Sequence, residues 1–276
     1  MTVIAMLQGT TDTDTETTRS GLALARMLNT SLTGLCALPD PASAVMVVTT
    51  PESTGLTAAA ARSVAQMQTE MLSKAEEAFR AGVADAAGVT STFVHQVATA
   101  EQAAASAATL ADALVFPRSA AKTGEPLSLG FDHVMMDARL PLILTGSAPY
   151  TPGPVIIGWD GSNGAARAVR LHLELIQAAG EAIIAQNRKD AERDGARPGI
   201  APDTLESWLA ARGVKARSAP IEGEVAASLL ALASGTGATA IVAGAYGHSR
   251  LGERLFGGTT RRLLNASEAP ALALAR

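Results

Sequence analysis

The sequence contains a single cysteine, Cys36, among 276 residues, and it is poor in aromatic and charged side chains. One cysteine excludes an intramolecular disulfide and a zinc site built from several thiolates, and it favours a reducing, cytoplasmic location. Aromatic residues make up 3% and charged residues 17% of the chain, against 47% hydrophobic residues. This composition excludes a disordered chain, and the length favours two globular domains.

Neither sign of charge dominates. The chain has 22 basic and 26 acidic residues and a net charge of -4, which gives no electrostatic basis for binding nucleic acid or an anionic membrane. The N-terminus lacks a basic region, so we expect no signal peptide. The uncharged stretch from Val225 to Gly247 is long enough for a membrane span, but Ser234 to Gly237 interrupts it, which predicts a helix, a turn and a strand instead.

The chain repeats an order of elements. The apolar run from Val3 that ends in a glycine-containing turn recurs from Val155, and the run from Asp112 recurs from Thr239. The offset between the halves falls from 152 residues at the first pair to 127 at the second, so the first half carries about 25 extra residues. These lie between Pro39 and Gly88 and include an alanine-rich stretch from about Leu56 to Val83, for which we expect a long helix.

Apolar runs alternate with helical patterns in both halves, which predicts parallel strands covered by helices. We therefore expect an α/β protein with two consecutive doubly wound open sheets, each of five parallel strands with helices on both faces. The expected strands are 3–7, 32–37, 90–95, 113–116 and 142–144 in the first half and 155–159, 182–186, 215–219, 240–244 and 271–274 in the second. Three prolines and a glycine in 147–154 suit a linker, so the expected domains are 1–146 and 155–276.

Ligands of such sheets bind beyond the carboxyl ends of the strands. In the second half, Asp160 follows the first expected strand, and its carboxylate can accept hydrogen bonds from an amino or hydroxyl group. The second candidate is the glycine-rich segment after the fourth strand. Gly257, Gly258, Thr259 and Thr260 run there into a short expected helix, which places backbone amides and hydroxyls where a phosphate can bind.

The same residues resemble the universal stress protein family. Its nucleotide-binding members show glycine, two residues, glycine, nine residues, glycine and then serine or threonine, and Gly244, Gly247 and Gly257 keep that spacing. The resemblance covers the second half well and the first half only in architecture, so the whole chain is similar to a tandem universal stress protein. It implies that the last strands of the two halves, 142–144 and 272–274, meet in a pseudo-twofold pair, for which exposed strand edges give a physical motive.

The resemblance implies an adenine nucleotide, ATP or else AMP or ADP with accompanying Mg²⁺, bound by the second half. Asp160 then lies near the base or ribose and the turn from Gly257 to Thr260 on the phosphates. Arg250 lies inside the glycine-rich segment and is a second candidate for the phosphate, whereas Arg261 and Arg262 fit a solvated helical face. Asp160 has an alternative role, because a carboxylate before Gly161 also stabilises a strand-to-helix turn.

Two departures from the family pattern bear on this expectation. Gly258 stands where the family has serine or threonine, so one hydroxyl is lost, although Thr260 falls on a second hydroxyl position of the family. In the first half, Gln8 replaces the counterpart of Asp160, and Pro117 removes an amide donor. We expect the first half to be a degenerate domain that binds no nucleotide in the usual place and has a packing or regulatory role.

Other motifs are incomplete. The stretch from Gly252 to Thr259 lacks the lysine of a phosphate-binding P-loop, since Gly258 occupies that place, and the glycines at 235 and 237 precede a strand where a dinucleotide fingerprint must follow one. His248 and Ser249 have no third residue to orient them, and the remaining histidines lack metal-ligand spacing. We therefore expect no catalytic residues, no metal site and at most very slow hydrolysis.

The leading expectation is a cytoplasmic stress-response protein that binds an adenine nucleotide, with the two halves paired inside the chain and a homodimer as a further assembly. The alternative is an interaction scaffold that has lost nucleotide binding and acts through protein partners. Gly258 favours this alternative. An ATP-cleaving enzyme of a related α/β family is disfavoured, because the Ser-Gly-Gly-x-Asp-Ser loop of such enzymes is absent after Trp159.

Overall fold

The computed structural model describes residues 2–41, 54–138, 140–187, 201–245, 258–266 and 268–276, and the side chains of all of these except 54–58. Its strands are β1 (Thr2–Leu7), β2 (Ser31–Leu38), β3 (Ser91–Val97), β4 (Ala113–Phe116), β5 (Leu142–Leu144), β6 (Val155–Gly158), β7 (Glu181–Asn187), β8 (Lys215–Ile221), β9 (Ala240–Gly244) and β10 (Ala271–Ala275). All ten expected strands are present, and no strand end is shifted by more than two residues.

The helices connect successive strands. They are α1 (Thr11–Met27), α2 (Thr54–Gly82), α3 (Ala100–Ala108), α4 (Ser128–His133), α5 (Asn163–Leu171), α6 (Leu173–Ala179), α8 (Pro202–Ala210), α9 (Val225–Thr236) and α10 (Gly258–Asn265), with a 3-10 turn at Arg118–Ala121 and a π-helical turn at Val134–Ala138. The extra residues of the first half form α2, as expected. Among the described residues, no helix combines the length and hydropathy that a membrane span requires.

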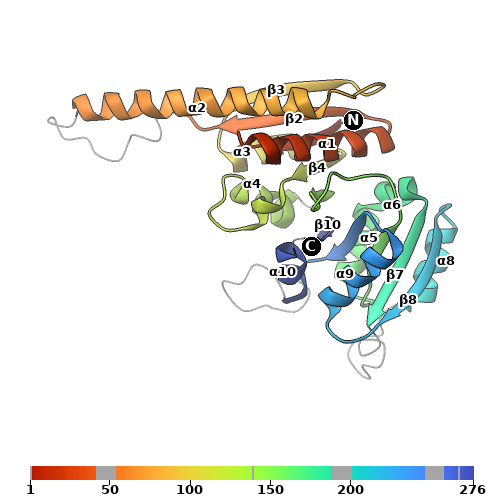
Figure 1. Ribbon diagram of the computed structural model, residues 1–276. Coiled ribbons are helices and arrows are strands. Elements are labelled where there is room, and N and C mark those ends of the chain that lie inside the picture. The colour runs from red at the N-terminus through yellow and green to blue at the C-terminus, as the bar shows by residue number, and fades with distance from the viewer. Residues whose placement is uncertain (1, 42–53, 139, 188–200, 246–257, 267) are drawn as a thin grey trace.

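The strands form one ten-stranded sheet in the order β3-β2-β1-β4-β5-β10-β9-β6-β7-β8. Each half contributes five parallel strands in the same internal order, which confirms the expected class. The halves do not make two separate sheets, however, because β5 and β10 pair antiparallel with Leu144 opposite Leu272 and Leu142 opposite Leu274. The expected pairing of the last strands is therefore confirmed, and it joins the two sheets into one (Figure 1).

Side chains that alternate along each strand build one core layer on either face of this sheet. Val3 and Val155 lie in the layer formed with α1, α2, α5, α6 and α8. Their neighbours Ile4 and Ile156 lie in the layer formed with α3, α4, α9 and α10. Strands buried on both faces explain the nearly continuous apolar runs in the sequence.

The helical segment after β6 is interrupted. Apolar residues recur at helical spacing from Ala166 to Ile176, but the structure divides this segment at His172 into α5 and α6. The buried His172 ring lies 3.0 Å from the carbonyl oxygen of Ala168 through Nδ1 and 3.3 Å from that of Leu142 through Nε2. The ring therefore reaches from the α5–α6 junction to β5 of the other half, which the helical periodicity did not indicate.

Candidate functional site

The connections of the second half change direction at β6. The chain runs from β6 outward to β7 and β8 and then crosses back to β9 on the other side of β6. A crevice opens at such a point, beyond the carboxyl ends of the two strands that flank it, and it is the usual ligand site of an open α/β sheet. Asp160 follows β6 and Gly244 ends β9, so two of the expected site residues flank this point.

Asp160 stabilises the turn that leads from β6 into α5. Its Oδ1 accepts a hydrogen bond of 2.9 Å from the backbone N–H of Ser162, across Gly161, whose φ of +70° lies in the left-handed region. Ser162 caps α5 by accepting a 3.2 Å hydrogen bond from the N–H of Ala165. The turn role that the sequence offered as the alternative for Asp160 is thus present, and it fixes the carboxylate at the strand tip.

Gly244 lets α5 approach the end of β9. A Cβ atom at this position would lie 2.8 Å from the carbonyl carbon of Gly164 and 2.9 Å from the backbone nitrogen of Ala165, both of which are backbone atoms that cannot yield. A side chain is therefore excluded here on packing grounds alone. The glycine spacing in the sequence identified Gly244 but did not reveal this reason for it.

The first turn of α10 contains Gly258, Thr259 and Thr260. The helix begins three residues earlier than the expected helix 261–264, so these residues carry N–H groups that have no acceptor within the helix. Thr260 is buried, and a Cβ added to the exposed Gly258 would have no atom of the described residues within 4 Å. The N–H groups at the helix N-terminus fit a phosphate group. Gly247, Arg250 and Gly257 lie outside the described residues.

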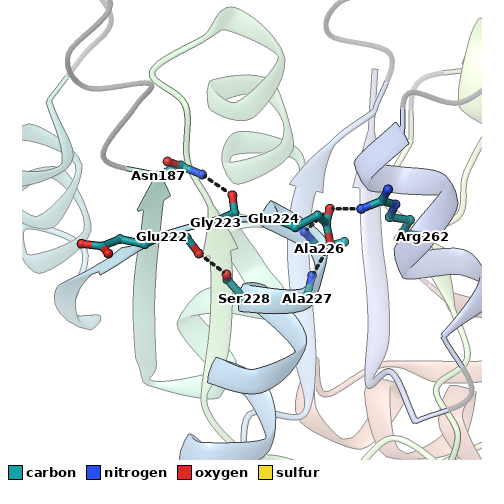
Figure 2. A network of polar contacts seen from close by, with 8 residues as sticks. All are labelled: Asn187, Glu222, Gly223, Glu224, Ala226, Ala227, Ser228 and Arg262. Atoms are coloured by element: carbon teal, nitrogen blue, oxygen red, sulfur yellow. Dashed lines mark hydrogen bonds and ion pairs between the residues drawn. The ribbon is translucent and has the colours of Figure 1, made fainter.

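An ion pair ties α10 to the start of α9 (Figure 2). Arg262 of α10 lies 3.1 Å from Oε1 of Glu224, and the two carboxylate oxygens of Glu224 accept hydrogen bonds from the N–H groups of Ala226 (3.1 Å) and Ala227 (2.8 Å). Slight desolvation acts to raise the pKa of Glu224, but these hydrogen bonds and Arg262 outweigh it and lower that pKa below its usual value. Arg262 thus lies on a largely exposed face of α10 and connects this helix to the start of α9 through a surface ion pair.

Close by, a side chain at the end of β7 contacts the segment that follows β8. Nδ2 of Asn187 donates a 3.1 Å hydrogen bond to the carbonyl oxygen of Gly223. The hydroxyl of Ser228 donates to the carbonyl oxygen of Glu222 at 2.7 Å. These contacts tie the end of β7 and the first turns of α9 to the segment that follows β8, beside the ion pair (Figure 2).

Arg118 of the first half holds the other end of α10. Its guanidinium donates to the carbonyl oxygen of Leu263, the sixth residue of α10, at 2.8 Å and to that of Pro270 at 2.7 Å. It also donates to the carbonyl oxygens of Thr145 (3.1 Å) and Ala269 (3.3 Å). Burial lowers the pKa of Arg118 to about 10. The sequence offered no signal for this contact, because its partners are backbone atoms, three of which lie about 150 residues away.

In the first half, a buried side chain of α1 binds the backbone amides of the turn that corresponds to Asp160 and Gly161. The buried carboxylate of Asp14 accepts hydrogen bonds from the N–H groups of Gln8 (3.0 Å), Gly9 (2.8 Å) and Thr10 (3.2 Å). Helix α2 covers the same turn, since a Cβ on Gly9 would lie 2.8 Å from Cβ of Met71. The role of Asp14 was not identified from the sequence, whereas the spacing of Met67 and Met71 in the alanine-rich stretch indicated packing residues. Both contacts fit the expectation of a degenerate first half.

The described residues contain no group of three or more histidine, cysteine, aspartate or glutamate side chains that could hold a metal ion. Cys36 is buried in β2, and burial together with the charge of Asp14 raises the pKa of its thiol to about 12. The thiolate that nucleophilic or redox chemistry requires is therefore strongly disfavoured at Cys36.

Comparison with known proteins agrees with this architecture. The crystal structure of a universal stress protein from Archaeoglobus fulgidus DSM 4304 covers 100% of this chain and 98% of its own, at a TM-score of 0.62 and 13% identity. The structure of a functionally unknown protein from Pseudomonas aeruginosa PAO1 covers 99% of this chain and 92% of its own, at a TM-score of 0.52 and 15% identity. The structure of a universal stress protein in complex with cAMP covers 45% of this chain and 97% of its own, at a TM-score of 0.36 and 22% identity.

The sequence comparisons give the second half its family. A search of the curated proteins finds no match to the chain. The model of the Universal stress protein family matches residues 153–274, a segment that includes β6 to β9, α10 and most of β10. The first half repeats the strand order of that segment and pairs with it through β5. Residues 153–274 of the chain therefore form a domain that matches the universal stress protein family.

Proposed function

We propose that the second half binds an adenine nucleotide at the carboxyl ends of β6 and β9. The observation that supports this most strongly is the position of Asp160 and Gly244 on either side of the point where the strand order reverses. The glycine spacing that begins at Gly244 then leads into α10. A nucleotide in this crevice meets Asp160 with its base or ribose and the first turn of α10 with its phosphates.

The start of α10 is suited to an anionic group for two reasons. Its first N–H groups and the hydroxyls of Thr259 and Thr260 supply donors, and the helix dipole favours negative charge at this end. The helix is held by the buried hydrogen bonds of Arg118 at its carboxyl end, which limits the ordering required when a phosphate binds.

ATP is the expected ligand, with AMP or ADP as alternatives and Mg²⁺ as an accompanying ion of the phosphates. Binding proceeds with little or no hydrolysis in this proposal, because the described residues offer no activated nucleophile and no metal cluster. The protein then acts as a nucleotide-dependent stress-response component. Its placement in the cytoplasm rests on the single buried cysteine.

The first half contributes no second site in this proposal. The amide groups of its β1–α1 turn already bind the Asp14 carboxylate, and α2 lies over Gly9. A nucleotide would have to displace both. The expected stoichiometry is therefore one nucleotide per chain.

Calorimetric titration of the nucleotide-free protein with ATP, AMP and ADP tests the proposal. One site per chain is expected, and Asp160→Ala is expected to weaken it. The matched control is Asp14→Asn, which changes the corresponding turn of the first half and should leave the affinity unchanged in a folded protein. Two sites per chain would refute the expectation that the first half binds no nucleotide. If none of the three nucleotides binds at millimolar concentration, the proposal is refuted.

A scaffold without nucleotide binding is the second candidate, and Gly258 is the observation that favours it. Its place at the start of α10 lacks the hydroxyl that the family pattern supplies there, so the phosphate loses one donor. If the titration shows no heat and the protein is recovered from cells without nucleotide, this candidate replaces the first.

A further inference from the structure

The ten-stranded sheet has two edge strands, and these differ in their content of charged residues and proline. The edges are β3 in the first half and β8 in the second, at opposite ends of the molecule (Figure 1). An exposed edge strand presents unpaired N–H and C=O groups that can bind a strand of another molecule. Natural proteins block such pairing with charged side chains and proline. β8 contains Lys215, Arg217 and Pro220, so this edge is protected.

β3 carries none of these protective residues. Its seven residues, Ser91–Val97, include no charged residue, no proline and no glycine. Val94 is 40% exposed and Val97 is 67% exposed. Within the described part of the chain, β3 has only one paired strand, β2. The first half thus presents a long, uncharged and partly apolar edge.

The backbone N–H and C=O groups of β3 point alternately toward β2 and away from the sheet. The N–H of Leu32 donates to the carbonyl oxygen of Thr90, and the N–H of Ala98 donates to that of Leu38, so the even-numbered residues of this segment bond to β2. The odd-numbered residues point their N–H and C=O groups away from the sheet. These outward residues are Ser91, Phe93, His95 and Val97.

We propose that a second copy of the chain pairs with this edge, β3 against β3, in an antiparallel dimer. A twofold axis through Val94, the central residue of the strand, places Phe93 opposite His95 and Ser91 opposite Val97 of the partner copy. All of these pairs join outward residues, so they are hydrogen-bonded pairs, and no like charges face each other. The interface is self-complementary and closed, as a twofold contact requires.

Two features favour a second copy over an unrelated strand. The chain already uses antiparallel pairing of equivalent strands to join its halves at β5 and β10. In addition, β3 is supported from behind, since Phe93 packs on Phe79 of α2 with ring centroids 5.8 Å apart. The edge is therefore an ordered template, and its register with itself uses the full length of the strand.

A cysteine at the axis gives a direct test. In the dimer, Val94 faces Val94 of the other copy in a non-hydrogen-bonded pair, where Cα atoms lie about 4.5 Å apart, within disulfide range. The only native cysteine, Cys36, is buried and does not compete. Val94→Cys is expected to form a disulfide-linked dimer rapidly under mild oxidation. The control is Leu110→Cys, which places a thiol at a residue that is 84% exposed on the turn before β4 and should link only slowly.

The oligomeric state provides the second measurement. Light scattering after size exclusion is expected to give a dimer for the native chain and for Leu110→Lys, and a monomer for Val94→Lys. His95→Pro is the companion variant, because it removes an outward N–H while leaving every hydrogen bond to β2 in place. Its circular dichroism should match that of the native protein.

A monomeric native chain at high micromolar concentration would overturn the proposal. So would a folded His95→Pro variant that remains dimeric, or equal rates of cross-linking at positions 94 and 110. None of these measurements requires nucleotide, so the result is independent of the function proposed above.

Discussion

At the scale of single residues, Gly258 bears directly on the phosphate site proposed at the start of α10. No atom of the described residues lies within 4 Å of where a Cβ at Gly258 would stand, and the φ of Gly258 is not left-handed. The glycine is therefore not required by the backbone. What it removes is a hydroxyl at the site where the anion is proposed to bind.

Gly258→Ser is accordingly expected to strengthen ATP binding about tenfold, since a hydrogen bond to a charged group contributes about 1.5 kcal/mol. Gly258→Ala is the matched control, because it adds the same Cβ without the hydroxyl and should leave the affinity nearly unchanged. Titration calorimetry measures both. Weaker binding by the serine variant would show that the phosphate does not lie at this position.

At the scale of elements, α10 connects the proposed ligand to the other half of the molecule. It is only eight residues long, and isolated helices of this length are not stable in water. Arg118 supplies the missing support by donating to Leu263 near the end of the helix and to Ala269 and Pro270 beyond it. A cation at the carboxyl end of a helix also interacts favourably with the helix dipole.

Arg118→Gln is expected to lower the free energy of unfolding by about 3 kcal/mol, because buried carbonyl oxygens lose charged donors. It should also weaken ATP binding, since α10 loses its fixed position. The control is Arg80→Gln, which breaks an exposed pair with Glu76 and should change stability by about 0.5 kcal/mol or less. Urea unfolding gives both values, and a similar loss in the two variants would contradict this role of Arg118.

At the scale of the whole molecule, the two halves meet in a core that includes an ionisable group. His172 is buried between the carbonyl oxygens of Ala168 and of Leu142 in the other half. A neutral imidazole carries one N–H, so it can donate to only one of the two. Burial lowers the pKa of His172 below its usual value, although both carbonyl oxygens act to raise it.

This lowered pKa predicts how stability depends on pH. The unfolded chain, with a histidine pKa of about 6.5, binds a proton more readily than the folded one. The contribution of His172 is therefore fully present above about pH 6.5 and is lost as the pH falls below it, with a slope of at most about 1.4 kcal/mol per pH unit.

The check is the free energy of unfolding of the native chain and of His172→Asn at about pH 7.5 and about pH 5.5. The native chain should lose more stability than the variant over this interval. The comparison removes the effect of shared groups, among them Asp14, whose pKa is raised by burial and which acts in the opposite direction. An equal loss in both proteins would show that His172 does not carry the dependence.

Much of the architecture could be predicted from the sequence, because it depends on local pattern. The apolar runs placed all ten strands, the repeat placed α2 in the insertion, and the glycine spacing identified Gly244, whereas α10 begins three residues before its expected start. The helix break at His172 could not be predicted, since the ring makes its second contact with β5, 30 residues earlier in the chain.

By itself, then, the sequence determined the α/β class, the order of the elements and the half of the chain that carries the nucleotide motif. Only the tertiary structure decided that the halves share one sheet, that Asp14 fills the turn of the first half, that Arg118 supports α10 and that β3 forms an unprotected edge. Periodicity reports which face of an element is buried, whereas these features depend on backbone groups far apart in the chain. Such groups look alike in every residue, so only the folded structure shows which side chain they meet.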